Sequence, residues 1–284
     1  MTIFKSYFAP RHHSEQPFFG SEYGVWFPPT ESPMLSRSLS LLFLCADLLP
    51  LPSASADVYE LRTYTTHDGK LDNLHARFRD HTVALFTKHG MESVGYWVPT
   101  DSPRSQNTLI YVLRHDSRDA AKASWKAFLS DPDWQQVYKE SEVDGPILAK
   151  APESIYMEAT DYSPKFQGND PSDEAVYELR IYRTAEGKLE PLDARFRDHT
   201  IGIFDRYQMQ SVGYWHPTDS PGSQDTLIYI LRHQSRDAAK DSWKSFGADE
   251  QWKQVAQESQ KNGRFLRERP EVVYMSPTDY SAIR

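Results

Sequence analysis

The hexapeptide Arg77-Phe78-Arg79-Asp80-His81-Thr82 occurs a second time, unchanged, at residues 195–200. The same offset of 118 residues aligns the Val-Tyr-Glu-Leu-Arg segment at 58–62 with 176–180, and Thr-Asp-Tyr-Ser at 160–163 with 278–281. No insertion or deletion is needed between these points. A fixed period sustained over this length is the signature of a repeated structural unit. The chain therefore contains two copies of one module.

Composition narrows the classes of protein that need to be considered. The 284 residues allow two ordinary domains, and a module of about 105 residues can bury its own core. The net charge of −8 argues against a nucleic-acid-binding protein, which normally carries a basic face. Cys45 is the single cysteine, so the chain cannot form an intrachain disulfide.

The segment before the first module has the pattern of an export signal. Residues 1–33 show no helical or strand period and are expected to be a disordered lead or the result of a mis-assigned start. Residues 34–56 combine a basic Arg37, an apolar run at 39–51 and the small-residue site Ala54-Ser55-Ala56. That run is too short for a mature membrane anchor. We expect export to the periplasm or secretion after cleavage near Ala56; the alternative is an apolar leader that is never removed.

The first module reads as strand, helix, strand, strand, helix and strand. Strict alternation of β-branched and aromatic residues predicts a strand at 58–65, and a helix of 3.6-residue period follows at about 70–89, ended by Gly90. The second copy has Gln208 in place of that glycine, so its helix should end by another geometry. Further strands are predicted at 91–98, 108–114 and 154–159, with helices capped by Ser117 and by Asp131 ahead of Pro132.

This order is the ferredoxin-like βαββαβ pattern, which leaves one face of its sheet without cover. Two copies in one chain can cover each other. The predicted fold class is therefore α+β: two tandem ferredoxin-like (βαββαβ) modules forming one intrachain dimeric-type α/β barrel. The first module spans 57–163, a linker rich in Pro, Gly and charge spans 164–175, and the second module spans 176–281.

Several motifs together resemble the NIPSNAP family. They are Tyr-Glu-Leu-Arg-x-Tyr at 59–64 and 177–182, Gly-Lys-Leu at the start of the first helix, Gly-Tyr-Trp in the second strand, and a closing Thr-Asp-Tyr. The resemblance covers both repeats and leaves out residues 1–56. It implies a dimeric α/β barrel in which two sheets enclose a pocket. It supplies no catalytic residues to carry over. Animal members are mitochondrial and bind other proteins, whereas this chain has a predicted export signal.

The polar side chains of the first strand are the first candidates for a site. Glu60, Arg62 and Tyr64 alternate with Tyr59, Leu61 and Thr63, so the two sets face opposite sides of the sheet. If the helices cover the apolar set, the polar set and its copy Glu178, Arg180 and Tyr182 point into the pocket between the sheets. Because buried charges must be paired, these residues could form a structural ion pair or bind a ligand.

His81 and His199 fall on the predicted apolar stripe of the first helix. A histidine there is most often a core residue, but it could also serve as a base or a ligand because it titrates near neutral pH. His115 and His233 follow the third strand and are expected to be exposed. His216 has no counterpart, since Val98 stands at that place.

No metal-ligand spacing, phosphate loop, nucleophile elbow or Rossmann glycine pattern occurs. No cofactor is predicted. The interpretation favoured is an exported small-ligand-binding or regulatory barrel. Its alternatives are a cofactor-independent monooxygenase with His81 aimed into an open pocket, a haem-binding barrel, and a protein-interaction scaffold. The partner could be a small molecule or a protein, and the chain could form a homo-oligomer.

Overall fold

The computed structural model describes residues 57–165 and 175–283. The predicted lead at 1–33, the predicted signal peptide at 34–56 and most of the predicted linker lie outside the described residues. Within these two ranges, every helix lacks the length or the apolar character that a membrane-spanning helix needs.

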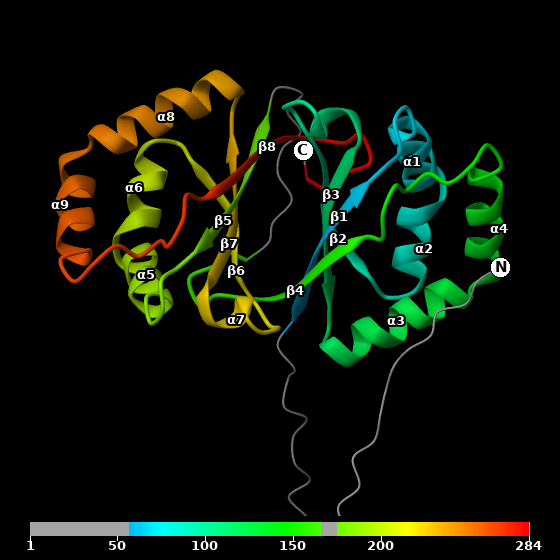
Figure 1. The fold of residues 1–284 in the computed structure, drawn as a ribbon, viewed down its shortest axis with the longest axis horizontal. Helices are drawn as coiled ribbons and strands as arrows, with labels where there is room; N and C mark the ends of the chain where they lie inside the picture. The colour runs from blue at the N-terminus through cyan, green and yellow to red at the C-terminus, as the bar shows by residue number, and fades with distance from the viewer. Residues whose placement is uncertain (1–56, 166–174, 284) are drawn as a thin grey trace, which may run out of the picture. The chain divides into compact units, whose positions relative to one another are not determined.

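The strands of the two repeats close into one barrel, as the sequence predicted, in the order β1-β3-β2-β8-β5-β7-β6-β4. All the pairings are antiparallel, and β2–β8 and β4–β6 join one repeat to the other. Figure 1 shows β4 and β8 crossing between the two halves. The strands of the first repeat are Val58–Thr65 (β1), Glu92–Pro99 (β2), Thr108–His115 (β3) and Glu153–Ala159 (β4); those of the second are Val176–Arg183 (β5), Gln210–Pro217 (β6), Thr226–His233 (β7) and Glu271–Pro277 (β8).

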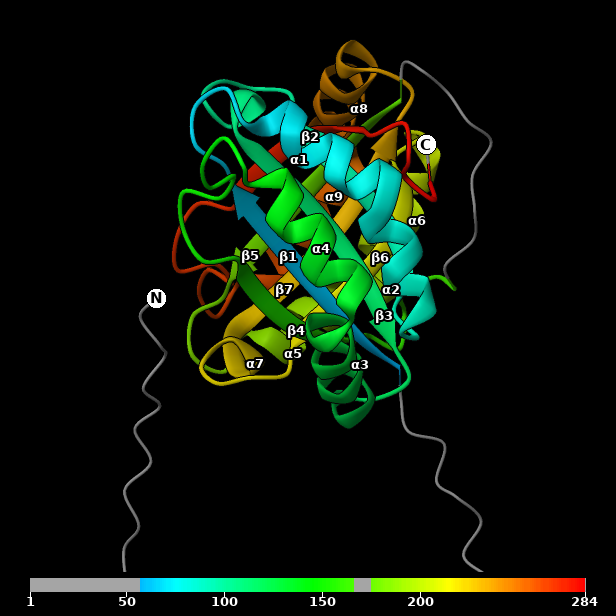
Figure 2. The same cartoon turned by 90° about the vertical axis from the view of Figure 1, so that its right-hand side faces the viewer.

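Helices cover the outside of the barrel on both flanks (Figures 1 and 2). The long first helix of each repeat is divided by a π-helical segment. In the first repeat the segments are Leu71–Arg77 (α1), Phe78–Thr82 (η1) and Val83–Lys88 (α2), followed by the short η2 at Arg104–Gln106, then Arg118–Ser130 (α3) and Pro132–Ser141 (α4). In the second repeat they are Leu189–Arg195 (α5), Phe196–Thr200 (η3) and Ile201–Arg206 (α6), followed by Gly222–Asp225 (α7), Arg236–Ala248 (α8) and Glu250–Ser259 (α9).

The closing Thr-Asp-Tyr-Ser segments tie each repeat to the other. Asp161 accepts two hydrogen bonds, of 2.8 and 2.6 Å, from the guanidinium of Arg197 in the second repeat. Tyr162 packs into the helix-facing core of the second repeat. Asp279 and Tyr280 make the reciprocal contacts with the first repeat. Each repeat therefore packs its closing motif against the other repeat, and these contacts help to hold the barrel closed within one chain.

The interior of the barrel is a single apolar cluster drawn from both repeats. It contains Leu61, Trp97, Tyr177, Leu179 and Trp215 among other buried side chains. Rings from opposite repeats meet there, as in the 5.6 Å approach between Trp97 and Tyr177. An eight-stranded barrel is just wide enough for side chains to fill. The predicted pocket between the sheets is therefore occupied by apolar side chains.

The predicted orientation of β1 is wrong. Leu61 lies in the interior cluster, whereas Tyr64 lies in the core beneath the helices. The polar set therefore faces the helices, and the apolar set faces the opposing sheet. The physical reason is that the interior is remote from any polar partner, while the helix layer supplies Trp and His side chains that can satisfy a buried carboxylate.

The π-helical segment also overturns the prediction for His81 and His199. A π turn inserts one extra residue, which rotates everything after it relative to an α-helical stripe. Thr82 takes the buried position and donates to the carbonyl of Arg77, five residues earlier, at 3.0 Å. His81 and His199 are exposed as a result.

The two repeats end this helix in the same way, against expectation. Gly90 has a φ of +72°, and Gln208 in the second repeat has a φ of +56°. Gln208 therefore adopts the left-handed conformation itself, at a steric cost that glycine does not carry.

Candidate ligand-binding site

A fully buried carboxylate lies beneath the helices of each repeat. Glu60 is 0 % exposed and accepts hydrogen bonds from Arg62 (2.6 Å), Trp125 (2.7 Å) and Ser154 (2.6 Å), with His115 Nε2 at 3.2 Å. Burial alone would raise the pKa of Glu60, but the hydrogen bond from His115, the charge of Arg62 and the remaining donors lower it to about 2. Glu60 is thus an ionised carboxylate whose acceptor sites are occupied by protein donors.

The second repeat repeats this cluster around Glu178. Arg180 donates at 2.7 Å and Trp243 at 2.7 Å, and His233 Nε2 lies at 2.9 Å. Burial alone would raise the pKa of Glu178, but the hydrogen bonds from His233 and Trp243 and the charge of Arg180 lower it. Burial and saturation with internal partners fit the structural ion pair better than a ligand site. The prediction that His115 and His233 are exposed was wrong: each is 1 % exposed, because it lies on the same helix-covered face of the sheet as the buried glutamate.

Tyr64 and Tyr182 also lie on the helix side and border these clusters. The guanidinium carbon of Arg62 lies 5.5 Å from the centre of the Tyr64 ring and 4.3 Å from that of Trp125. The guanidinium carbon of Arg180 lies 5.6 Å from the centre of the Tyr182 ring and 4.2 Å from that of Trp243. The strand residues predicted as one pocket are therefore brought together, but in two separate clusters outside the barrel interior.

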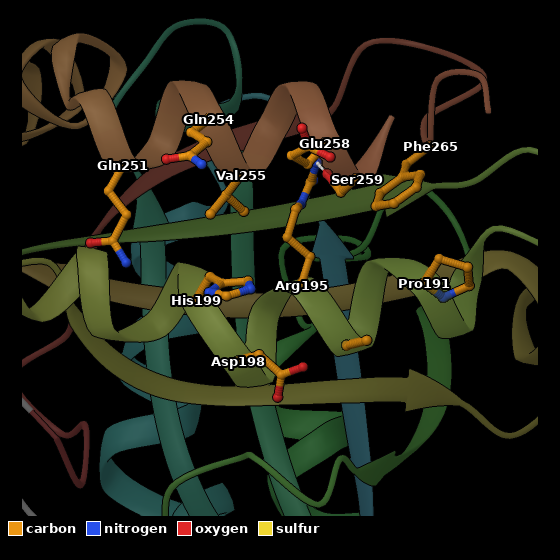
Figure 3. A pocket seen from close by; sticks show the side chains of 11 residues that line it. Pro191, Arg195, Asp198, His199, Gln251, Gln254, Val255, Glu258, Ser259 and Phe265 are labelled. Carbon is orange, nitrogen blue, oxygen red and sulfur yellow. Dashed lines mark hydrogen bonds between the residues drawn. The ribbon is translucent and has the colours of Figure 1, made fainter. Parts of the chain in front are cut away.

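An open groove of about 650 Å³ lies between α5–η3 and α9 of the second repeat, and we call it the second-repeat groove. Figure 3 shows Arg195 and His199 directed from the lower helix toward α9, with Asp198 on the opposite side of that helix. Ser259 and Glu258 face them from α9. The groove is lined by Pro191, Ala194, Arg195, Asp198, His199, Gln251, Gln254, Val255, Glu258, Ser259 and Phe265.

The first repeat has a smaller groove at the same place, about 260 Å³ in volume. All eight of its lining residues correspond to residues of the second-repeat groove at the 118-residue offset: Asn73, Ala76, Arg77, Asp80, His81, Val137, Glu140 and Ser141. The hexapeptide thus supplies Arg, Asp and His to a groove in each repeat. The π-helical segment places the histidine there, because it turns that residue out of the core.

Arg195 also borders an inner cavity of about 270 Å³ on the side of the sheet. This cavity is lined mainly by aromatic side chains of the second repeat, Trp243, Phe246 and Trp252 among them. Arg195 therefore borders both the second-repeat groove and this inner cavity. Arg195 was not among the site residues predicted from the sequence.

The described residues contain no group of three or more His, Cys, Asp or Glu side chains placed to hold a metal ion. A cofactor-independent monooxygenase of the predicted kind would need a base aimed into an open pocket between the sheets. His81 does not supply that base. That side chain lies on the outer surface, in the first-repeat groove.

The NIPSNAP family model matches residues 59–164 and 177–282, one match for each repeat. The chain belongs to the NIPSNAP family. The matched ranges coincide with the two modules and exclude the segment before Asp57. A comparison with curated protein sequences finds no match.

Solved structures with the same fold include proteins that are not named as NIPSNAP proteins. A proposed monooxygenase from Fusobacterium nucleatum is 11 % identical, with a TM-score of 0.52 over 78 % of this chain and 93 % of its own. One from Lactobacillus acidophilus is 12 % identical, with a TM-score of 0.51 over 81 % and 97 %. A NIPSNAP domain protein from Burkholderia xenovorans is 19 % identical and covers 38 % of this chain and 99 % of its own, with a TM-score of 0.33. The first two likenesses show the barrel fold of this NIPSNAP protein.

Proposed function

We propose that this protein binds a small organic molecule in the second-repeat groove. The observation that carries the proposal is a groove of about 650 Å³ whose wall combines apolar side chains with Arg195 and His199. Small-molecule sites are typically concave, a few hundred to a thousand Å³ in volume, and mostly apolar with a few convergent polar groups.

The packing of the barrel interior argues against a ligand site there. Its side chains from both repeats pack against one another, so a ligand would have to displace buried Trp and Tyr rings there. Both walls of the groove, α5–η3 and α9, come from the second repeat of the same chain. A protein partner or a homo-oligomer, which the resemblance allows, is compatible with this proposal and plays no part in it.

A fragment screen by NMR on the isotopically labelled full chain tests the proposal. Binding fragments should shift resonances of His199 and of α9. Val255→Trp should block the groove and abolish those shifts. Val137→Trp, the matched change in the first repeat, should leave them intact. The proposal fails if no fragment shifts these resonances, or if the shifts persist equally in Val255→Trp.

We also propose that the chain is exported and cleaved near Ala56. Arg37, the apolar run and Ala54-Ser55-Ala56 support this proposal. Sequencing the N-terminus of protein isolated from its native host should give Asp57 first. Recovery of residues 34–56 on the mature protein would contradict it.

A further inference from the structure

Arg195 is a buried cation without a carboxylate partner among the described residues. The residue is 8 % exposed, and its Nη1 donates one long hydrogen bond, 3.4 Å, to the hydroxyl of Ser259. Its Nε has no hydrogen-bond partner. The guanidinium carbon lies 5.1 Å from the centre of the Trp252 ring and 4.7 Å from that of Phe265. Buried charges are normally paired, so this arrangement calls for an anion.

The first repeat shows what the missing partner is. Arg77 occupies the equivalent position, and its Nη1 lies 3.5 Å from a carboxylate oxygen of Glu142. The residue at that position in the second repeat is Gln260. The side-chain amide of Gln260 is engaged by the backbone, since it accepts from the N–H of Phe265 and donates to the carbonyl of Ala256, both at 3.3 Å. The second repeat thus keeps the buried arginine and lacks its counter-ion.

The other charges around Arg195 do not replace that carboxylate. Glu258 is paired with Lys261, and Asp198 lies on the side of its helix away from α9 (Figure 3). On the inner side, Arg264 stands where the first repeat has Pro146, and Glu268 is paired with Arg183 at 3.4 Å. Gln260 and Arg264 thus replace Glu142 and Pro146 of the first repeat, and Glu268, which replaces Lys150, has Arg183 as its own cation.

We infer that the second-repeat groove takes a small organic carboxylate, whose oxygens pair with Arg195 and whose apolar body lies against Phe265 and Val255. Arginine binds carboxylates through charged N–H donors, and Nη1 of Arg195 makes only one long hydrogen bond within the protein. The hydroxyl of Ser259, on the opposite wall, accepts from Arg195 and donates to the carbonyl of Ala256, both at 3.4 Å. The inference rests on the proposed function and adds the charge of the ligand to it.

The test uses the full chain and two carboxylates, benzoate and phenylacetate, each compared with its neutral primary amide by NMR titration. At least one carboxylate should bind roughly 10- to 100-fold more tightly than its amide, the ratio expected for a charge-assisted contact. Gln260→Glu should supply the missing counter-ion and weaken carboxylate binding by at least about tenfold, with no loss of thermal stability.

Gln254→Glu is the matched control, because it adds the same charge on the exposed part of the groove wall rather than beside Arg195. It should weaken binding by less than about threefold. The inference is overturned if carboxylates bind no better than their amides, or if Gln260→Glu and Gln254→Glu behave alike. Fragments that bind the groove only when neutral would overturn the inference and leave the proposed function standing.

Discussion

Replacing Arg62 with methionine should destabilise the fold strongly, because it leaves Glu60 buried without its cation. The two side chains are 14 % and 0 % exposed, and the atoms that pair them are 2.6 Å apart. Breaking a buried pair by removing one partner costs about 3–5 kcal/mol. The partial exposure of Arg62 and the three remaining donors to Glu60 place the expected loss near the lower end, about 3 kcal/mol. For a protein of this size that corresponds to a fall in Tm of roughly 6–12 °C.

Differential scanning calorimetry and urea unfolding measure this loss directly. Arg180→Met is the matched variant in the second repeat, where the pair is 2.7 Å apart and equally buried, and it should lose a similar amount. Adding Glu60→Leu to Arg62→Met should restore stability only in part. Trp125 and His115 would then be buried donors without their acceptor. A Tm within about 1 °C of the parent for Arg62→Met would refute the ion-pair account.

Three further predictions follow from the same structure. Because the pKa of Glu60 falls from 4.5 to about 2 on folding, its contribution of roughly 3 kcal/mol is fully present above pH 4.5 and is lost as the pH falls toward 2. The stability gap between the parent and Glu60→Gln in urea unfolding should therefore narrow from pH 6 to pH 3, and a constant gap would contradict this. Gln208→Gly should stabilise by about 0.5–1 kcal/mol by relieving a positive φ, whereas Gly90→Gln should destabilise. Residues 57–163 expressed alone should form a dimer, because β2 and β4 each lose a partner strand. Size-exclusion chromatography with light scattering measures this, and a well-folded monomer would refute the barrel shared between the two repeats.

The succession of strands and helices was predictable because local chemistry marks it. Alternating residues fixed β1 at Val58–Thr65, and Ser117 and Asp131 cap α3 and α4 by accepting from backbone N–H groups as expected. The repeat in turn predicted that one chain would close the barrel. These features depend on short-range pattern and on symmetry, both of which the sequence displays directly.

The site was less predictable, because alternation separates two faces of a strand without saying which one is inside. Pairing of Glu60 with Arg62 was correct, but their partners Trp125 and His115 come from α3 and β3, which only the fold brings near. No residue pattern in the hexapeptide requires a π turn, so the outward rotation of His81 and His199 was missed. The comparison of Glu142 with Gln260 was visible in the sequence, but its meaning depends on the burial of Arg195.

A crystal structure of the full chain grown with phenylacetate tests the central claim most directly. The account predicts the carboxylate of phenylacetate about 2.7–2.9 Å from guanidinium nitrogens of Arg195, with the ring against Phe265 in the second-repeat groove and no such molecule beside Arg77. Phenylacetate inside the barrel, or Arg195 paired with a carboxylate of the protein itself, would contradict it.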